Sequence, residues 1–234
     1  MLILGIESTA AAASAAVVQD GKLLGEFFVN TKQTHSQTLL PMVEALLNNL
    51  GVACGDLDCI AVANGPGSFT GVRIGVACVK GLALPHNTLC CGVSTLEAIA
   101  YGGLGQVGSV VCAAMDARCA QVYNALFEAT EQGLVRLTED RAIPIQELGR
   151  ECERYGDRLV LFGDGAALCH REFAAWGARL APEPVRFQRA GSVALLAQDR
   201  QWIASGELLP TYLRMPQAER ELKAKQSLGK REGV

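Results

Sequence analysis

Three short apolar runs separated by turn residues occupy the first thirty positions. Leu2 to Ile6 is the first run, and Ala13 to Val18 is the second. The second run is closed by Gln19-Asp20-Gly21-Lys22, and Asp-Gly between two apolar runs is a strong hairpin signal. Leu23 to Val29 supplies a third run. The pattern predicts an antiparallel meander of three strands.

After this meander, the pattern changes to helices that alternate with buried strands. A helix is predicted from Ser36, as its N-cap, to about Leu50. Pro41 is compatible with that helix only in or near its first turn. The next predicted elements are a strand over Cys59 to Ala63, a helix over Gly71 to Leu84, a strand over Thr88 to Val93 and a helix over Thr95 to Tyr101.

The glycine-rich stretch from Tyr101 to Gly108 ends this series, and the strand pattern then begins again. The second half opens with predicted strands over Ser109 to Met115, Ala120 to Phe127 and Leu134 to Arg141. We therefore expect an internal repeat with a hinge near residue 105. A meander followed by helices, occurring twice, is typical of the α/β actin-like ATPase superfold (ASKHA, ribonuclease H-like), in which two related lobes with mixed sheets face a nucleotide cleft.

This pattern predicts three parts of the chain. Residues 1–105 form an N-terminal lobe, residues 106–209 a C-terminal lobe, and residues 210–234 a C-terminal helix or basic tail. From Arg214 to the end there are six basic and three acidic residues. We expect this tail to be a solvated helix or a frayed end, because blocks of charge usually are.

Composition narrows the class of protein. Of the 234 residues, 50% are apolar and 19% are charged, below the usual share of about 25%. A net charge of −3 gives no overall field for nucleic acid. The nine cysteines contain no C-x-x-C pair. The pattern of apolar runs leads us to expect neither a signal peptide nor a membrane span. We expect a cytoplasmic protein with reduced, mostly buried cysteines, no metal, and apolar surface to spare.

Two predicted helices carry apolar side chains on more than one face. In the helix from Gly71, one stripe is Val72, Val76, Val79 and Ala83, and another is Ile74, Cys78 and Leu82. In the helix from Ser36, the rows are Leu39, Val43, Leu46 and Leu50, and Leu40 and Leu47. Only one stripe of each helix can face its own sheet. The surplus predicts a protein interface, unless a second layer of this chain covers it.

The segment Gly65 to Gly75, GPGSFTGVRIG, lies between a predicted strand and a predicted helix. It lacks the Gly-Lys-Ser/Thr ending of a Walker loop and the spacing of a dinucleotide fingerprint. Two interpretations remain open, an anion-binding loop or a tight turn in which Ser68 or Thr70 caps the helix. The candidate residues of an anion or nucleotide loop are Gly65, Gly67, Ser68, Thr70, Gly71 and Arg73.

This segment resembles the hallmark Gly-Pro-Gly-Ser-Phe-Thr-Gly-x-Arg-x-Gly of the TsaB (YeaZ) family of bacterial proteins. Two departures are Glu7, where the family more often has Asp, and Gln121, where it often has Glu. They put phosphate or metal chemistry at those two positions in doubt. Other similar stretches span almost the whole chain: Glu7-Ser8-Thr9, His35 to Pro41, Asp116-Ala117-Arg118 with Val122-Tyr123, Gly163-Asp164-Gly165, and Pro210 to Arg214.

The resemblance implies a role in making threonylcarbamoyladenosine (t6A) in tRNA. It implies a non-catalytic scaffold that pairs with the catalytic subunit TsaD through a helical bundle and is joined by the ATPase TsaE. Alone, the chain is expected to form a homodimer, to contact tRNA only through the complex, and to hold no cofactor of its own except a nucleotide shared with partners. The expected interface residues are Ser36, Leu39, Leu40, Val43, Leu47, Val72, Val76, Val79 and Ala83. We expect Val76→Glu or Leu47→Glu to abolish association and leave the fold intact.

Two other classes of function remain as alternatives. An actin-like kinase or ATPase is suggested by the Gly65 to Gly75 segment and by Gly163-Asp164-Gly165. A metallopeptidase would need clustered ligands, whereas His35, His86 and His170 are isolated from one another in sequence. Ser68 lacks the G-x-S-x-G surroundings of a hydrolase nucleophile.

Overall fold

The computed structural model describes residues 1–31 and 33–214 of the chain, so the predicted tail beyond Arg214 lies outside the described residues. Its first sheet has the strand order β3-β2-β1-β4-β5. The first three strands are antiparallel neighbours, as the Asp-Gly turn predicts, and β4 and β5 add in parallel. The strands are β1 (Leu2–Glu7), β2 (Ala13–Gln19), β3 (Lys22–Val29), β4 (Cys59–Gly65) and β5 (Leu89–Ser94).

The second sheet repeats this topology, with the strand order β11-β10-β6-β7-β8. Again a meander comes first, and two later strands join in parallel on the far side of its first strand. The predicted internal repeat is therefore confirmed. The strands are β6 (Val110–Asp116), β7 (Gln121–Thr130), β8 (Gly133–Arg136), β9 (Arg141–Pro144), β10 (Leu159–Phe162) and β11 (Arg179–Leu180).

Two local predictions are wrong. The expected strand over Leu134 to Arg141 is two short strands, β8 and β9, each paired with a different part of β7. The long helix begins at His35 after the N-cap Thr34, not at Ser36. Pro41 therefore lies in the second turn, where it cannot donate a hydrogen bond to the carbonyl of Gln37. Both residues are exposed, so water can satisfy that carbonyl.

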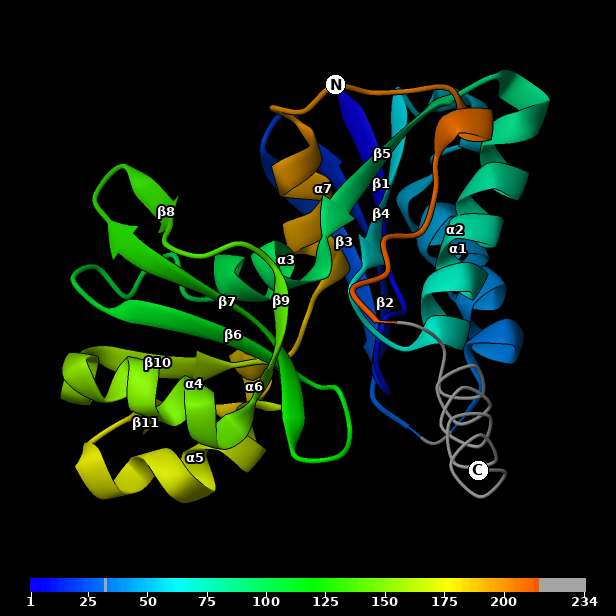
Figure 1. Ribbon diagram of the computed structural model, residues 1–234. Helices are drawn as coiled ribbons and strands as arrows, with labels where there is room; N and C mark the ends of the chain where they lie inside the picture. The colour runs from blue at the N-terminus through cyan, green and yellow to red at the C-terminus, as the bar shows by residue number, and fades with distance from the viewer. Residues whose placement is uncertain (32, 215–234) are drawn as a thin grey trace, which may run out of the picture.

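Helices cover both faces of each sheet (Figure 1). On the first sheet, α1 and α2 pack on one face and α7 on the other. On the second sheet, α4 and α5 form a core with one face, and α3 packs on the other. The helices are α1 (His35–Leu50), α2 (Phe69–Ala83), α3 (Thr95–Tyr101), α4 (Ile145–Cys152), α5 (Ala166–Phe173), α6 (Glu183–Arg186) and α7 (Ala190–Ala197).

The two halves exchange helices. The first half of the chain supplies α3 to the second sheet, and the second half returns α7 to the first sheet. The expected division near residue 105 therefore separates the two sheets but not the helices that cover them. None of the helices in the described ranges is long and apolar enough to cross a membrane.

Candidate functional site

The glycine segment packs its backbone directly against the loop that follows β1. A Cβ on Gly71 would collide with the carbonyl oxygen of Ser8, and one on Gly67 with that of Thr9. The Ser68 N–H donates to the Thr9 carbonyl at 2.6 Å, and the Ser68 hydroxyl accepts from the Gly71 N–H at 3.3 Å. Ser68 is thus the N-cap of α2, as one of the two interpretations predicts. Close packing within the chain accounts for these glycines.

A segment close to the end of the described chain closes over this turn. Thr211 donates its N–H to the carbonyl of Asn64 at 2.7 Å, and the ring of Tyr212 stacks on that of Phe69 with centroids 4.5 Å apart. The guanidinium of Arg73 lies 3.8 Å from the Phe69 ring centroid, and its Nε donates to the Tyr212 hydroxyl at 3.0 Å. In the described structure, Arg73 is therefore engaged in a clamp between α2 and the segment 209–214.

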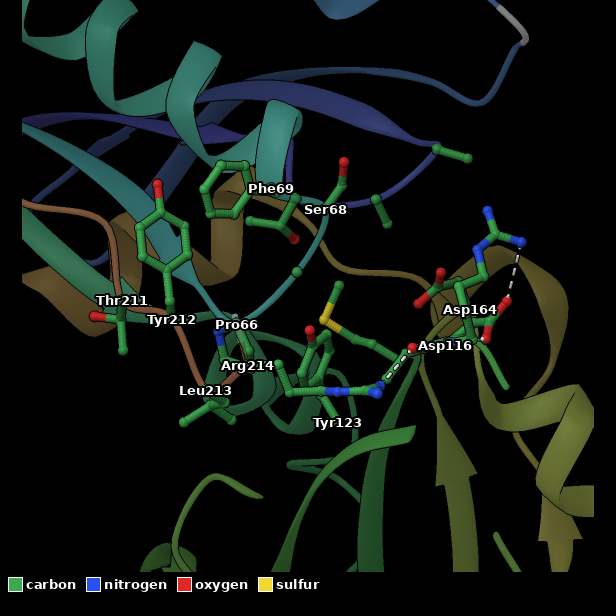
Figure 2. Close-up of a pocket in the computed structure, with 17 residues that line it drawn as sticks. Pro66, Ser68, Phe69, Asp116, Tyr123, Asp164, Thr211, Tyr212, Leu213 and Arg214 are labelled. Atoms are coloured by element: carbon green, nitrogen blue, oxygen red, sulfur yellow. Dashed lines mark hydrogen bonds and ion pairs between the residues drawn. The ribbon is translucent and has the colours of Figure 1, made fainter. Parts of the chain in front are cut away.

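Between the two sheets lies a cavity of about 430 Å³, which we call the inter-sheet cavity. Figure 2 shows the Asp164 side chain directed into it beside Asp116. Two arginines line the cavity. Arg118 forms an ion pair with Asp116 at 3.5 Å, and the guanidinium of Arg214 donates a hydrogen bond to the Ala117 carbonyl at 2.8 Å. Its lining residues are Thr9, Ala10, Ala11, Pro66, Gly67, Ser68, Phe69, Met115, Asp116, Ala117, Arg118, Tyr123, Asp164, Thr211, Tyr212, Leu213 and Arg214.

Burial raises the pKa of two carboxyl groups, one that lines the cavity and one in the core next to it. Burial raises the pKa of Asp164, which lines the cavity, to about 6. Glu7, the last residue of β1, is fully buried and does not line the cavity, and burial raises its pKa to about 7. The N–H and the hydroxyl of Thr9, a residue of the cavity wall, both donate to Oε1 of Glu7 at 2.6 Å, which limits the rise in pKa. Both carboxyl groups therefore titrate above their ordinary range.

A second depression lies on the outer side of α1 and α2. It has a volume of about 520 Å³ and is mostly apolar, and we call it the α1–α2 groove. Leu40, on α1, is 52% exposed at this groove. A smaller depression lined by Val43, Leu47 and Val52 adjoins it through Leu40 and Leu82. The groove is lined by His35, Ser36, Leu39, Leu40, Ile74, Ala77, Cys78, Gly81 and Leu82.

The structure divides the expected interface residues into two groups. Ser36, Leu39 and Leu40 line the α1–α2 groove, and Val43 and Leu47 line the adjoining depression.

The other four, Val72, Val76, Val79 and Ala83, line neither depression, because α2 packs this stripe against the first sheet. The structure therefore contradicts their assignment to a partner surface, and the stripe of Ile74, Cys78 and Leu82 faces the groove instead. Val76 and Leu47 are 5% and 7% exposed, so a glutamate at either position would bring a charge into the core, and burial contradicts the expectation that these variants leave the fold intact.

The structure also shows the contacts of His35 and Gln121 and the state of the nine cysteines. The ring Nε2 of His35 lies 2.6 Å from the carbonyl oxygen of Ala10, so it links α1 to the loop at the cavity. Gln121 begins β7, where its N–H donates to the carbonyl of Arg118. All nine cysteines are free thiols, and Cys119 alone among them is classed as exposed.

Comparisons with known proteins identify relatives over nearly the whole chain. The family model described as TsaD, tRNA N6-adenosine threonylcarbamoyltransferase, matches residues 22–153. The tRNA threonylcarbamoyladenosine biosynthesis protein TsaB of Escherichia coli (strain K12) is 33% identical, covering 97% of this chain and 100% of its own. The protein of the same name from Bacillus subtilis (strain 168) is 31% identical, covering 94% and 96%.

Solved structures agree with these relatives. YeaZ from Pseudomonas aeruginosa matches with a TM-score of 0.72 and 27% identity, covering 91% of this chain and 99% of that one. The ethanolamine utilization protein EutJ from Carboxydothermus hydrogenoformans matches with a TM-score of 0.53 and 13% identity, covering 83% and 90%, a likeness of fold alone.

The duplicated sheet, with helices on both faces and a cavity between the copies, defines an α/β protein of the actin-like, ribonuclease H-like superfold. Within that class the relatives are specific. The chain belongs to the TsaB (YeaZ) family of tRNA threonylcarbamoyladenosine biosynthesis proteins.

Proposed function

We propose that this chain is the non-catalytic partner subunit of a t6A-forming complex, and that it docks the catalytic subunit TsaD on the α1–α2 groove. The observation that carries this proposal is the groove itself. Its apolar side chains come from α1 and α2, and Leu40 on α1 is 52% exposed. A large exposed apolar patch on a folded domain is typical of a protein interface.

The composition of the groove suits a partner helix. Ile74, Cys78 and Leu82 repeat at helical spacing along α2, and Gly81 leaves room because nothing lies within 4 Å of where its Cβ would be. Close approach at such a glycine favours helix packing against helix. The same surface is proposed to pair with a second copy of this chain when TsaD is absent.

The proposed complex includes TsaE, and this chain contacts tRNA only through the complex. The scaffold role is supported by what the hallmark residues do. Ser68 uses its hydroxyl to cap α2, and Arg73 is held between Phe69 and Tyr212. Both side chains therefore stabilise the described fold through contacts within the chain, and these contacts involve no substrate.

The test is assembly with TsaD by a charged variant of the groove. Leu40→Glu combined with Leu82→Glu places two carboxylates on a surface that a partner must desolvate. Size-exclusion chromatography with light scattering should show at least a tenfold weaker complex and a monomer in place of the homodimer. Far-UV circular dichroism should be unchanged.

The matched control is Leu84→Glu, because Leu84 is 70% exposed and lies in the turn after α2, outside the groove. It introduces one carboxylate where the groove variant has two, and it should assemble like the parent chain. A groove variant that still bound TsaD with parental affinity would refute the proposal, as would equal losses in the groove variant and the control.

A further inference from the structure

The chain continues for twenty residues beyond the part that the structure describes, and we call residues 215–234 the tail. The α1–α2 groove is mostly apolar, and Leu40 is 52% exposed there among the described residues. Removing apolar surface from water is favourable. A tethered segment with a matching apolar side therefore gains free energy by lying in the groove.

The described chain ends beside α2. Gly206 accepts a hydrogen bond from Nζ of Lys80 at 3.2 Å, and the Tyr212 hydroxyl accepts one from Nε of Arg73 at 3.0 Å. The segment between these two contacts thus runs along α2 from its last turn toward its start (Figure 1). Ile74, which follows Arg73, lines the groove. The tail therefore begins near the end of α2 at which the groove begins.

The tail is long enough to lie along the groove. On α2 the groove extends from Ile74 to Leu82, a distance of about 12 Å along a helix axis. A helix over residues 216–228 would be about 20 Å long. Because the tail is tethered, its effective concentration at the groove is of millimolar order, and a modest contact area is enough to hold it there.

The sequence of the tail has several signals of a short helix. Pro216 and Gly229 stand where a helix commonly begins and ends. Glu219 and Glu221 each precede a lysine by four positions, which is the spacing of an ion pair on a helix surface. The acids come before the lysines, an order that also favours a helix through its dipole.

One side of such a helix is apolar. Met215, Ala218 and Leu222 recur at i, i+3 and i+7, so that they form one stripe. The tail as a whole has five basic and three acidic residues, whereas α1 has the acid Glu44 and neither lysine nor arginine. Glu44 is exposed and borders the depression that adjoins the groove. The stripe thus matches the groove, and the positive charge of the tail matches its rim.

We propose that the tail covers the α1–α2 groove of the free chain with the stripe of Met215, Ala218 and Leu222, and that a docking partner displaces it. The regulation of assembly by the tail rests on the proposed function, in which TsaD uses the same groove. The tail shields the side chains of the groove from solvent and competes with any partner for them.

The experiment measures how fast iodoacetamide alkylates the Cys78 thiol in the full chain, followed by mass spectrometry of the peptide that contains it. Cys78 is half-buried and lines the groove, so a tail that lies there shields it. Leu222→Glu places a carboxylate in the apolar stripe and should raise the rate roughly threefold or more. Leu228→Glu is the matched control. It adds the same charge to the tail about 120° away around a helix, and it should react at the parental rate.

Dilution separates the tail from a second copy of the chain. Shielding by the tail is intramolecular, so the rate in the parent should be independent of protein concentration. A rate that rises on dilution would assign the shielding to a second copy and overturn the proposal. Equal rates in the parent and Leu222→Glu, or equal gains in Leu222→Glu and Leu228→Glu, would also overturn it.

Binding of TsaD, measured by isothermal titration calorimetry, tests the proposed function separately. Leu222→Glu should bind TsaD roughly threefold more tightly than the parent or more, since TsaD no longer has to displace the tail. Leu228→Glu should bind like the parent. Faster alkylation of Leu222→Glu with unchanged TsaD affinity would support the contact between tail and groove and contradict docking of TsaD there. Unchanged alkylation would overturn the tail contact, even where the groove variants lose TsaD.

Discussion

The inter-sheet cavity and the α1–α2 groove lie on either side of the glycine segment and its helix, yet they are opposite in character. The cavity is lined by Asp116, Asp164 and two arginines, and its backbone walls are in tight contact. The groove is lined mainly by aliphatic side chains and is open to solvent. The N-terminal end of α2, with Ser68 and Phe69, thus lines the cavity, whereas its side with Ile74, Cys78 and Leu82 lines the groove.

The difference teaches that one helix can serve two surfaces. At the start of α2, Gly71 lets the helix backbone touch the carbonyl of Ser8, whereas nothing lies within 4 Å of where a Cβ of Gly81 would be. The backbone contact requires glycine at position 71. At position 81, glycine only leaves the surface open.

The largest expected effect is that of Gly71→Ala. Its Cβ would collide with the Ser8 carbonyl oxygen, a backbone atom that cannot move without shifting β1 and its loop. We expect the free energy of unfolding to fall by about 4 kcal/mol. The companion variant Gly81→Ala, in the same helix, should instead stabilise by about 0.5–1 kcal/mol, because alanine is the better helix former. Urea denaturation of both variants measures the contrast, and equal effects would contradict it.

The next effect concerns Glu7, the acid buried at the end of β1, and depends on pH. The folded chain holds the proton of Glu7 up to a pH of about 7, since burial has raised its pKa, whereas the unfolded chain releases it near 4.5. Stability contributed by the protonated form is therefore lost as the pH rises from about 4.5 to 7. A pKa difference of this size corresponds to about 3 kcal/mol.

Glu7→Gln removes this titration. At pH 8 we expect the free energy of unfolding of the variant to exceed that of the parent by about 2 kcal/mol, after a loss of about 1 kcal/mol for its unpaired amide. At pH 4 the advantage should disappear. Denaturation curves at several pH values provide the measurement, with Asp199→Asn as the control, since Asp199 is exposed. A difference that does not change with pH would mean that Glu7 is ionised in the folded chain across this range.

The sequence allowed the elements and the repeat to be predicted, because periodicity and turn residues are local signals. Asp20-Gly21 predicted its hairpin, and Ser68 was one of two predicted caps. The choice between the two apolar stripes of α2 was not local. Val72 and Ile74 are equally apolar, and the position of the sheet decides which one is buried. The presence of two apolar stripes on α2 therefore predicted that one stripe would be left over for an interface. It did not predict which stripe, and the sequence assigned Val72, Val76, Val79 and Ala83 to the interface although the sheet buries them.

Contacts between distant segments were also beyond local signals. Arg73 and Tyr212 are 139 positions apart, and both lie in motifs that the sequence singled out. Only the fold brings them together. The burial of Glu7 follows in the same way from its place at the end of a central strand, with β2 and β4 on either side.

The smallest expected effect tests the clamp of Phe69, Arg73 and Tyr212 at the cavity. Tyr212→Phe keeps the stacking on Phe69 and removes only the hydroxyl that accepts from Arg73 at 3.0 Å. Because Tyr212 is 42% exposed, water can replace this partner, and we expect a loss of about 0.5 kcal/mol. Tyr212→Ala also removes the stacked ring and should cost about 1.5 kcal/mol. Thermal unfolding of the two variants separates the contributions. Tyr212 lines the cavity and not the groove, so Tyr212→Ala should leave assembly with TsaD unchanged. A loss of assembly would instead place the clamp on the groove side of α2.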